Sequence, residues 1–282
     1  MRRIAVIGGG VSGLTAGYVL SRTDDVTLFE ADHRLGGHAD THLVVPATGP
    51  SMPVDTGFIV CNERTYPLLT RLFTELGVTT RPSEMSMSVQ CGGCGLQYAG
   101  QRGLGGLAAG VSQGGYSDYF KAHFALPLVA AVWSCPPGTA LSYPAEYLFR
   151  FLANHGMLSI SGSPPWRTVV GGSRSYVERV AKRLQTVRVS APVRAVHRHP
   201  GGVEVHDAAG EALTFDAVVI ATHPDQALRL LAEPTQAEQE VLGAFQYTPT
   251  RRCCTPTPAC CRPARRPERP GTTSSATAVP AR

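Results

Sequence analysis

The stretch IAVIGGGVSGLTAGYVL, residues 4–20, decides the fold of this chain. A short apolar run with β-branched residues leads into a glycine-rich turn, and the residues after the turn have the apolar spacing of a helix. Gly8 permits a tight turn, Gly10 lets the backbone approach a pyrophosphate, and Gly13 lets the helix pack closely on the strand. Val11 and Ser12 would begin the helix beside the phosphate oxygens. The stretch therefore predicts the strand, turn and helix of a dinucleotide-binding fold.

A second strand with an acidic end follows this helix. Residues 26–29 read VTLF and lead into Glu30. This acid comes about twenty residues after the turn, where a carboxylate can accept hydrogen bonds from both ribose hydroxyls. Its charge would repel a 2′-phosphate, which disfavours NADP. Because the glycine motif alone is weak evidence, the second strand and its terminal acid are what favour a dinucleotide site over an incidental loop.

A second glycine pair separates two cofactor hypotheses. Residues 31–39 read ADHRLGGHA, and a simple NAD domain has no need of the second pair, Gly36 and Gly37. The block resembles the E-A-x-x-R-x-G-G-R block of the flavin amine oxidase, phytoene desaturase and protoporphyrinogen oxidase group. The resemblance implies FAD in an extended form. The residues that it places near FAD are Ser12, Glu30, Ala31, Arg34, Gly36, Gly37 and His38. His38 stands where many members carry Arg, a better phosphate partner than imidazole, so a solvent-facing loop residue is the alternative interpretation.

Later blocks are similar to a bacterial subgroup described as NAD/FAD-binding oxidoreductases. These blocks are residues 54–60 (VDTGFIV), 62–67 (NERTYP), 82–86 (PSEMS), 155–158 (HGML), 166–173 (WRTVVGGS) and 215–226 (FDAVVIATHPDQ). The resemblance covers most of residues 1–250. It implies an α/β fold of the two-dinucleotide-binding-domain flavoprotein type, with a Rossmann-like FAD domain and an inserted α+β substrate region.

The strand signals predict that the FAD domain is split in sequence. Residues 187–189, 193–196 and 202–205 are typical of short strands, and residues 217–221 of a buried strand in a mostly parallel sheet. The backbone around Val193 and Thr222 would then flank the adenine and the pyrophosphate. The predicted parts are residues 1–45 and 184–232 for the FAD domain, 46–183 for the substrate region, 233–250 for the start of a C-terminal region, and 251–282 for a disordered tail.

Catalytic residues are not identified by the sequence. Residues 65–76 and 173–184 have helical periodicity, and residues 114–133 carry aromatic side chains that either line an apolar pocket or form ordinary core. His123 and His155 are better explained as core or surface residues than as bases. In flavin enzymes the isoalloxazine ring accepts the hydride, so a missing acid or base is not evidence against catalysis.

Eight cysteines fall into two groups, and neither predicts a metal. Four lie in the body, and four crowd the tail at residues 253, 254, 260 and 261. Cys91 and Cys94 have the spacing of half a zinc site or a redox pair, but no second C-x-x-C or H-x-H cluster accompanies them. We therefore interpret them as incidental thiols on a turn between strands, and we expect the thiols to be reduced.

The chain changes character beyond residue 250. Seven Arg against one Glu give residues 251–282 a net charge of +6, so the remainder, at about −1, is close to neutral. The tail has no aromatic residues for base stacking, so we expect no nucleic-acid partner. We interpret it as the product of a reading-frame shift near residue 250, and a short connection at residues 107–113 as an internal deletion. The chain would then be truncated relative to the group.

Composition and resemblance together predict an enzyme. With 43% hydrophobic and 17% charged residues, the 282-residue chain is globular, and no export signal or spanning segment is expected, which favours a cytoplasmic protein. We predict an FAD-dependent oxidoreductase of amine oxidase type that removes hydride from a small organic, lipid-like substrate. The alternatives are a non-enzymatic remnant and an NAD-binding dehydrogenase. Peripheral membrane contact has no support, and the sequence leaves the oligomeric state open.

Overall fold

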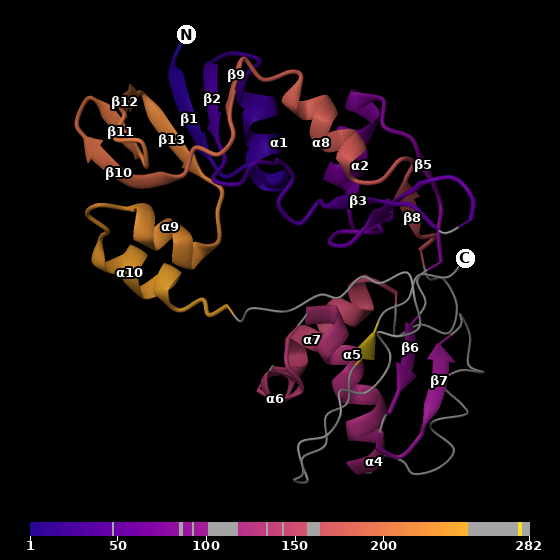
Figure 1. Ribbon diagram of the computed structural model, residues 1–282. Coiled ribbons are helices and arrows are strands. Elements are labelled where there is room, and N and C mark those ends of the chain that lie inside the picture. The colour runs from indigo at the N-terminus through magenta and orange to yellow at the C-terminus, as the bar shows by residue number, and fades with distance from the viewer. Residues whose placement is uncertain are drawn as a thin grey trace. The chain divides into compact units, whose positions relative to one another are not determined.

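The structure, a computed structural model of the whole chain, divides into two compact units. It describes residues 1–46, 48–84, 87–91, 93–100, 118–133, 135–142, 144–156, 164–247 and 276–277 (Figure 1). Unit 1 comprises Met1–Ile59, Leu68–Arg81 and Thr168–Tyr247, and unit 2 comprises Val60–Pro67, Pro82–Arg167 and Thr248–Arg282. The two sequence segments predicted to build the Rossmann domain both lie in unit 1, whereas the predicted domain boundaries remain predictions.

A four-stranded parallel sheet forms the centre of unit 1. Its strands, in spatial order, are β13 (Ala217–Ile220), β1 (Arg3–Ile7), β2 (Asp25–Phe29) and β9 (Thr186–Arg188). All three pairings are parallel, with Val6 opposite both Val219 and Leu28. Val6 and Leu28 are fully buried, as expected for parallel strands covered on both faces. The predicted parallel sheet is confirmed, but β13, which was predicted to be buried, is half-buried because it is an edge strand of this sheet.

Helices of unit 1 form where periodicity predicted them. Helix α1 (Val11–Leu20) follows β1 and packs against β2 and α8 (Arg174–Ala181), as Figure 1 shows. Helix α2 (Pro67–Leu76) buries Phe73, whose ring lies 5.2 Å from that of Tyr176 on α8. Both rings come from the apolar face of an amphipathic helix, so burial of that face positions α2 and α8.

A separate antiparallel sheet supports the end of β2. Strands β10 (Val193–His199), β11 (Gly202–Asp207) and β12 (Ala212–Phe215) pair in that order. The tight connection Pro200–Gly201 between β10 and β11 requires a hairpin, which is why these predicted strands do not join the parallel sheet. Phe215 meets Phe29 edge to face at 6.0 Å, in a core that includes Val196 and Val205. Helices α9 (Pro224–Leu230) and α10 (Gln236–Gly243) follow.

Two short sheets carry the connecting segments. Strands β3 (Thr41–Val44) and β4 (Met52–Asp55) form an antiparallel hairpin. Strand β5 (Thr80–Pro82) pairs with β8 (Arg167–Val169). These segments matter because the residues at the start of β3 and the end of β4 reach the start of α8.

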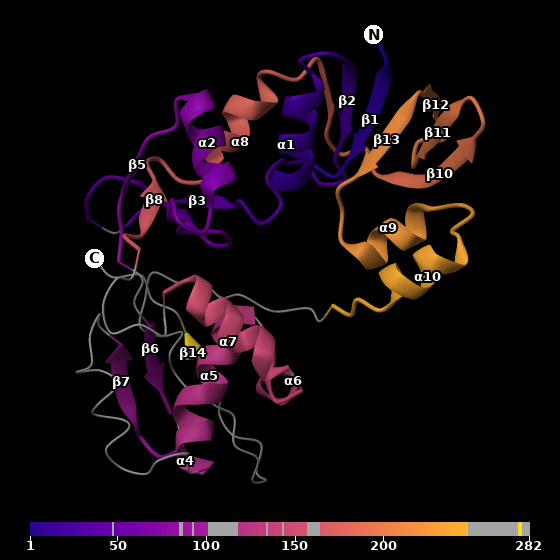
Figure 2. The same ribbon diagram turned by 180° about the vertical axis from the view of Figure 1, so that it is seen from behind.

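Unit 2 contains a further hairpin and several short helices (Figure 2). Strand β6 (Met87–Gln90) pairs with β7 (Gln97–Gly100) and with β14 (Ala276–Thr277). The helical segments are α4 (Asp118–Phe120), the π-helical turn η1 (Lys121–Ala125), α5 (Leu126–Trp133), α6 (Pro137–Ala140) and α7 (Ala145–Asn154). In the parts of the chain that are described, no helix combines the length and apolar content needed to cross a bilayer.

Several sequence predictions lie outside the described residues. These are residues 85–86 of the PSEMS block, the short connection at residues 107–113, residues 114–117 of the aromatic stretch, residues 157–158 of the HGML block, and the tail apart from β14.

Candidate functional site

The glycine turn between β1 and α1 is the geometric centre of the candidate site. Gly8 has a φ of +106°, and a side chain there would lie 2.7 Å from the carbonyl oxygen of Ala221. At Gly13 a Cβ would lie 1.8 Å from the Gly8 oxygen, so only glycine lets α1 pack so closely on the turn. At Gly10, in contrast, a Cβ would meet nothing within 4 Å. Gly10 therefore presents bare backbone to open space.

The N-terminus of α1 has the features of an anion-binding helix start. Gly10 is the N-cap residue, no side chain caps this helix, and its first turn carries no acidic residue. Leu14 N donates to Gly10 O at 2.9 Å, so the helix starts at the turn, with Ser12 exposed on its first turn and Val11 half-buried. The N–H groups of a helix start carry partial positive charge and bind phosphate oxygens. Val11 and Ser12 thus lie on the first turn of α1, and their contact with phosphate stays a prediction.

Glu30 lies against this turn at the end of β2. Its Oε2 accepts a hydrogen bond from Gly9 N at 2.6 Å, and its Oε1 accepts one from Asp32 N at 2.8 Å. Backbone N–H groups therefore fix the carboxylate next to the glycine turn, while Ala31 follows as an exposed residue. A carboxylate held here can accept hydrogen bonds from ribose hydroxyls of a nucleotide whose phosphates lie over Gly10.

The second glycine pair docks on the first turn. Gly36 N donates to Gly9 O at 2.8 Å, and Gly36 forms a parallel β-bridge with Gly10. A Cβ on Gly37 would lie 3.2 Å from the Cα of Gly10. Two segments of small, bare backbone are therefore adjacent, which is what a dinucleotide running past the first turn requires.

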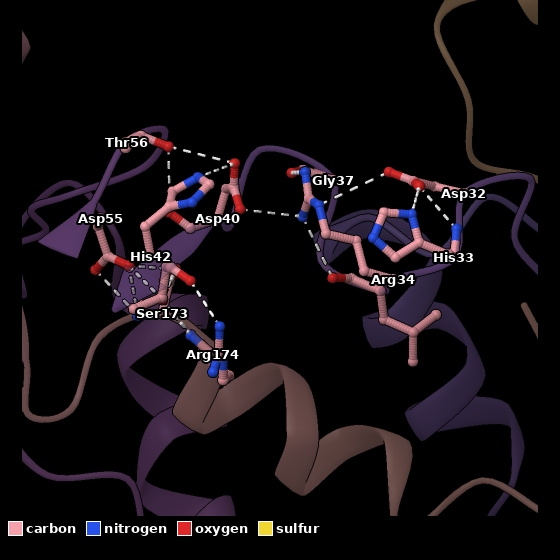
Figure 3. Close-up of polar contacts among 12 residues, drawn as sticks. Asp32, His33, Arg34, Gly37, Asp40, His42, Asp55, Thr56, Ser173 and Arg174 are labelled. Atoms are coloured by element: carbon pink, nitrogen blue, oxygen red, sulfur yellow. Dashed lines mark hydrogen bonds and ion pairs between the residues drawn. The ribbon is translucent and has the colours of Figure 1, made fainter. Parts of the chain in front are cut away.

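Arg34 fixes the loop that carries the second glycine pair (Figure 3). Its Nη2 donates to Gly37 O at 3.0 Å, and its guanidinium lies 3.5 Å from an Asp40 oxygen and 3.7 Å from an Asp32 oxygen. Burial opposes ionisation of Asp40, but the hydrogen bond with His42 and the charge of Arg34 leave its pKa below the usual value. Arg34 is therefore near the predicted cofactor position, and its observed partners belong to its own loop.

His38 is exposed, but its backbone is tightly held. Phe58 N donates to His38 O at 2.9 Å, and a Cβ on Gly57 would lie 1.8 Å from that same oxygen. The His38 ring stacks on His223 with 5.8 Å between centroids, and His223 stacks on Tyr247 at 4.3 Å. His38 thus lies beside the turn after β13, and its imidazole stands where many members of the group carry Arg.

Asp55 joins β3, β4 and α8 (Figure 3). Its carboxylate accepts hydrogen bonds from Thr41 Oγ1 at 2.5 Å, from Ser173 N at 3.0 Å and from Ser173 Oγ at 2.8 Å. Arg174 in turn donates to the backbone oxygen of Thr41 at 2.8 Å. A negative charge at the N-terminus of α8 is favourable. The resemblance identified the block around Asp55, but its role depends on residues 118 positions away and has no local signal.

Thr222 and Val193 reach the site from the second sequence segment. Thr222 Cγ2 would lie 3.3 Å from a Cβ on Gly8, so the turn after β13 lies directly beside the glycine turn. Ala191 N donates to Glu30 O at 2.9 Å, which leads Val193 into β10 next to the end of β2. All thirteen predicted site residues therefore belong to unit 1, on or next to the carboxyl ends of β1, β2 and β13, where nucleotides bind in such sheets.

The aromatic side chains of unit 2 mainly contact each other. Phe151 stacks on His155 at 3.9 Å and lies 5.1 Å from Trp133, while His155 lies nearly parallel to Trp166 at 6.1 Å. Tyr66 Oη lies 3.4 Å from His155 Nε2, and burial, followed by nearby Cys61, raises the pKa of Tyr66. Burial likewise raises the pKa of the Cys61 thiol, despite the opposing charge of Arg167. These contacts are typical of core packing and identify no catalytic base.

The residues present fit a flavin dinucleotide. At Gly10 the backbone faces open space that a Cβ would occupy. The start of α1 supplies N–H groups, and Glu30 supplies a fixed hydrogen-bond acceptor for the ribose. The second glycine pair extends the bare backbone beyond what one mononucleotide needs. The arrangement can therefore hold the adenosine diphosphate half of FAD.

Comparison with known families agrees with this geometry. Residues 6–76 match the model of an NAD(P)-binding Rossmann-like domain. Residues 107–279 match the model described as flavin containing amine oxidoreductase. The second match covers more than half of the chain.

Curated relatives match over short segments of this chain. Tryptophan 2-monooxygenase from Pantoea agglomerans pv. gypsophilae is 46% identical over 57 residues, which is 20% of this chain and 10% of that protein. Protoporphyrinogen oxidase 2 from Arabidopsis thaliana is 62% identical over 37 residues, 13% of this chain and 7% of that protein. The matched segments thus span a tenth or less of these relatives.

Solved structures share the fold over most of this chain. A putrescine oxidase mutant from a study of cofactor binding aligns with a TM-score of 0.60 and 19% identity, over 86% of this chain and 63% of that chain. A fatty acid isomerase from P. acnes that produces CLA aligns with a TM-score of 0.57 and 17% identity, with the same coverage. The chain therefore spans just under two thirds of these neighbours.

Proposed function

This chain belongs to the flavin containing amine oxidoreductase family, and from that premise we propose that it is an FAD-dependent oxidoreductase that removes hydride from an organic substrate. The observation that carries the proposal is the open backbone at Gly10, flanked by Glu30 on one side and by Gly36–Gly37 on the other. The family match confirms the resemblance drawn from the sequence, and flavin is the cofactor by which that family is described.

The residues of unit 1 divide the work of holding FAD. The start of α1, with Val11 and Ser12, binds the pyrophosphate, and Glu30 accepts hydrogen bonds from the ribose hydroxyls. Arg34 keeps the second glycine pair in place beside Gly10. The backbone around Val193 and Thr222 flanks the adenine and the pyrophosphate.

The chemistry of the reaction is supplied by the flavin when it is bound, because its ring accepts the hydride. The protein then needs to bind the substrate, orient it and exclude water from it. It does not need to supply a nucleophile. A lipid-like substrate is supported by the structural neighbour that is a fatty acid isomerase. A cytoplasmic location and a truncated carboxyl-terminal part remain predictions.

The visible spectrum of the purified protein tests the cofactor. Yellow protein with flavin absorption, or colourless protein that acquires it on addition of FAD, supports the proposal. Protein that does not bind FAD but is stabilised against unfolding by NAD would support the NAD-binding alternative. Protein that binds neither would support a non-enzymatic remnant.

A matched pair of variants then tests the role of Glu30. Glu30→Gln removes the charge but keeps the size of the side chain, and we expect weaker FAD binding. Because Gln has only one oxygen to accept from Gly9 N and Asp32 N, the thermal midpoint should also fall, so affinity is measured well below the midpoint of the variant. Glu240→Gln, on the exposed face of α10, should leave binding unchanged. Equal FAD affinity of wild type and Glu30→Gln would contradict the assigned role.

Anaerobic mixing tests the substrate class. If the substrate is lipid-like, fatty-acyl or isoprenoid compounds will bleach the bound flavin without oxygen. Bleaching by amines but by none of these lipids would contradict the lipid assignment while leaving the flavin assignment intact.

A further inference from the structure

The turn between β6 and β7 brings two thiols close to one imidazole. Cys91 and Cys94 lie on this turn, and His123 comes from η1 in the same unit. Cys94 Sγ lies 3.1 Å from His123 Nε2, and the three candidate ligand atoms all lie within 4.8 Å of one another. Sequence spacing could not reveal this cluster, because His123 lies 29 residues beyond Cys94.

From this juxtaposition we propose that Cys91, Cys94 and His123 bind one zinc ion. Bonds of about 2.0–2.3 Å around tetrahedral zinc place sulfur and nitrogen ligands about 3.5–3.8 Å apart. The observed distances between the ligand atoms run from 3.1 Å to at most 4.8 Å, so they include this range. Small shifts of the side chains would therefore give tetrahedral coordination. Two sulfur donors and one nitrogen donor favour zinc or another soft metal over magnesium or calcium. On binding, both thiols release their protons to solvent. This revises the sequence-based prediction of no metal.

The turn has the hydrogen bonds of a rigid two-cysteine ligand loop. Cys91 N donates to Leu96 O at 2.8 Å, and Gly95 N donates to Cys91 O at 3.0 Å. The turn is thereby closed upon itself, and both cysteines are free thiols, Cys94 being exposed to incoming metal. The Cys91 thiol is hydrogen-bonded by the backbone N–H groups of Cys94 and Gly93 and by the Cys94 side chain. Such N–H groups stabilise a thiolate, which is the form that binds metal.

The helical side of the site is also ordered by its neighbours. His123 lies on a π-helical turn, an irregularity that often occurs at functional positions. The Tyr119 ring packs edge to face on the His123 ring at 4.2 Å. The Tyr119 hydroxyl hydrogen-bonds to Cys94. Partners of this kind orient the first ligands of a metal.

The metal would join the β6–β7 turn to the helices that follow it. Three protein donors leave a fourth position of the tetrahedron for water or another donor. All three ligands belong to unit 2, whereas the residues proposed to hold FAD belong to unit 1, so metal binding at this cluster does not require bound flavin.

Metal titration of the full chain tests the site. Reduced, chelator-treated protein is titrated with Co²⁺, whose tetrahedral thiolate complexes are strongly coloured, and the colour is then displaced by Zn²⁺. We expect one Co²⁺ per chain at this site, lost in Cys94→Ser and retained in the matched control Cys135→Ser. A variant with Ser at all four tail cysteines, residues 253, 254, 260 and 261, should retain the colour. No coloured complex with wild type, or colour that survives Cys94→Ser and disappears in the tail variant, would overturn the proposal.

Alkylation of the wild-type protein provides a test that needs no variant. Each thiol is followed by mass spectrometry during reaction with iodoacetamide, with and without Zn²⁺. Zinc at ten times its dissociation constant leaves about a tenth of the sites free, so Cys91 and Cys94 should react about tenfold more slowly. Cys135 serves as the internal reference and should be unaffected. Unchanged rates at Cys91 and Cys94 under zinc would overturn the proposal.

Discussion

Replacing Gly10 by Ala separates the stability of the fold from its ability to bind a dinucleotide. Gly10 has φ −71° and ψ 178°, which Ala adopts without strain, and its Cβ would meet nothing within 4 Å. Ala is a poorer N-cap by about 0.5–1 kcal/mol. Replacing Gly by Ala also restricts the unfolded chain, which raises the free energy of unfolding by about 0.4–1 kcal/mol. The two effects oppose each other, so the free energy of unfolding should change by less than about 1 kcal/mol.

The affinity for FAD should fall much more than the stability when Gly10→Ala adds this methyl group. The methyl group would occupy the space in which the pyrophosphate approaches the start of α1. Loss of one hydrogen bond to a charged group costs about 1.5–3 kcal/mol, which weakens binding by about 10- to 150-fold. Thermal melts give the stability, and an FAD titration followed by flavin fluorescence gives the affinity.

Two other glycines provide the controls. Gly201→Ala, which also adds a Cβ to open space, should change neither quantity. Gly13→Ala places its Cβ 1.8 Å from Gly8 O and should lower the thermal midpoint. Wild-type FAD affinity in Gly10→Ala would refute the assigned path of the pyrophosphate.

Three further predictions concern polar contacts of unit 1. Asp55→Asn removes the charge that accepts hydrogen bonds at the start of α8 and should destabilise the fold by about 1–3 kcal/mol in denaturant melts; a loss no larger than that of the surface control Glu240→Gln would show that the charge is unimportant. Arg34→Met frees the second glycine loop, and we expect FAD affinity to fall by less than about tenfold because the lost ion pairs are partly exposed; an unchanged affinity would argue against a positioning role. The hydrogen bond from Arg198 lowers the pKa of Glu238 to about 2, from 4.5, so its stabilisation is complete above about pH 4.5 and is lost as the pH falls towards 2. The difference in thermal midpoint between wild type and Glu238→Gln should shrink over that interval, and a constant difference down to pH 2 would be inconsistent with this pKa.

Local signals made the Rossmann core predictable from sequence. The turn at Gly8–Gly13, its flanking strand and helix, and Glu30 interact over short stretches of chain, and the structure places them as expected. The apolar run at residues 217–221 also identified a parallel strand, although β13 is half-buried and not buried as predicted.

Contacts between distant segments were not predictable in the same way. Asp55 acts through Ser173, and Cys94 meets His123 on a π-helical turn that no 3.6-residue period reveals. The antiparallel β10–β12 sheet likewise depends on a tight turn whose consequence for strand direction was not drawn from the sequence. Side-chain pairing between segments far apart in the chain leaves no periodic signal in a single sequence.

Competition between ADP and FAD tests most directly whether the glycine turn and Glu30 hold the adenosine diphosphate half of the cofactor. FAD is titrated into the full chain at several fixed ADP concentrations. We predict saturable binding of one FAD per chain, with an apparent dissociation constant that rises in proportion to ADP. FAD binding that ADP does not affect, or no FAD binding at all, would contradict the account.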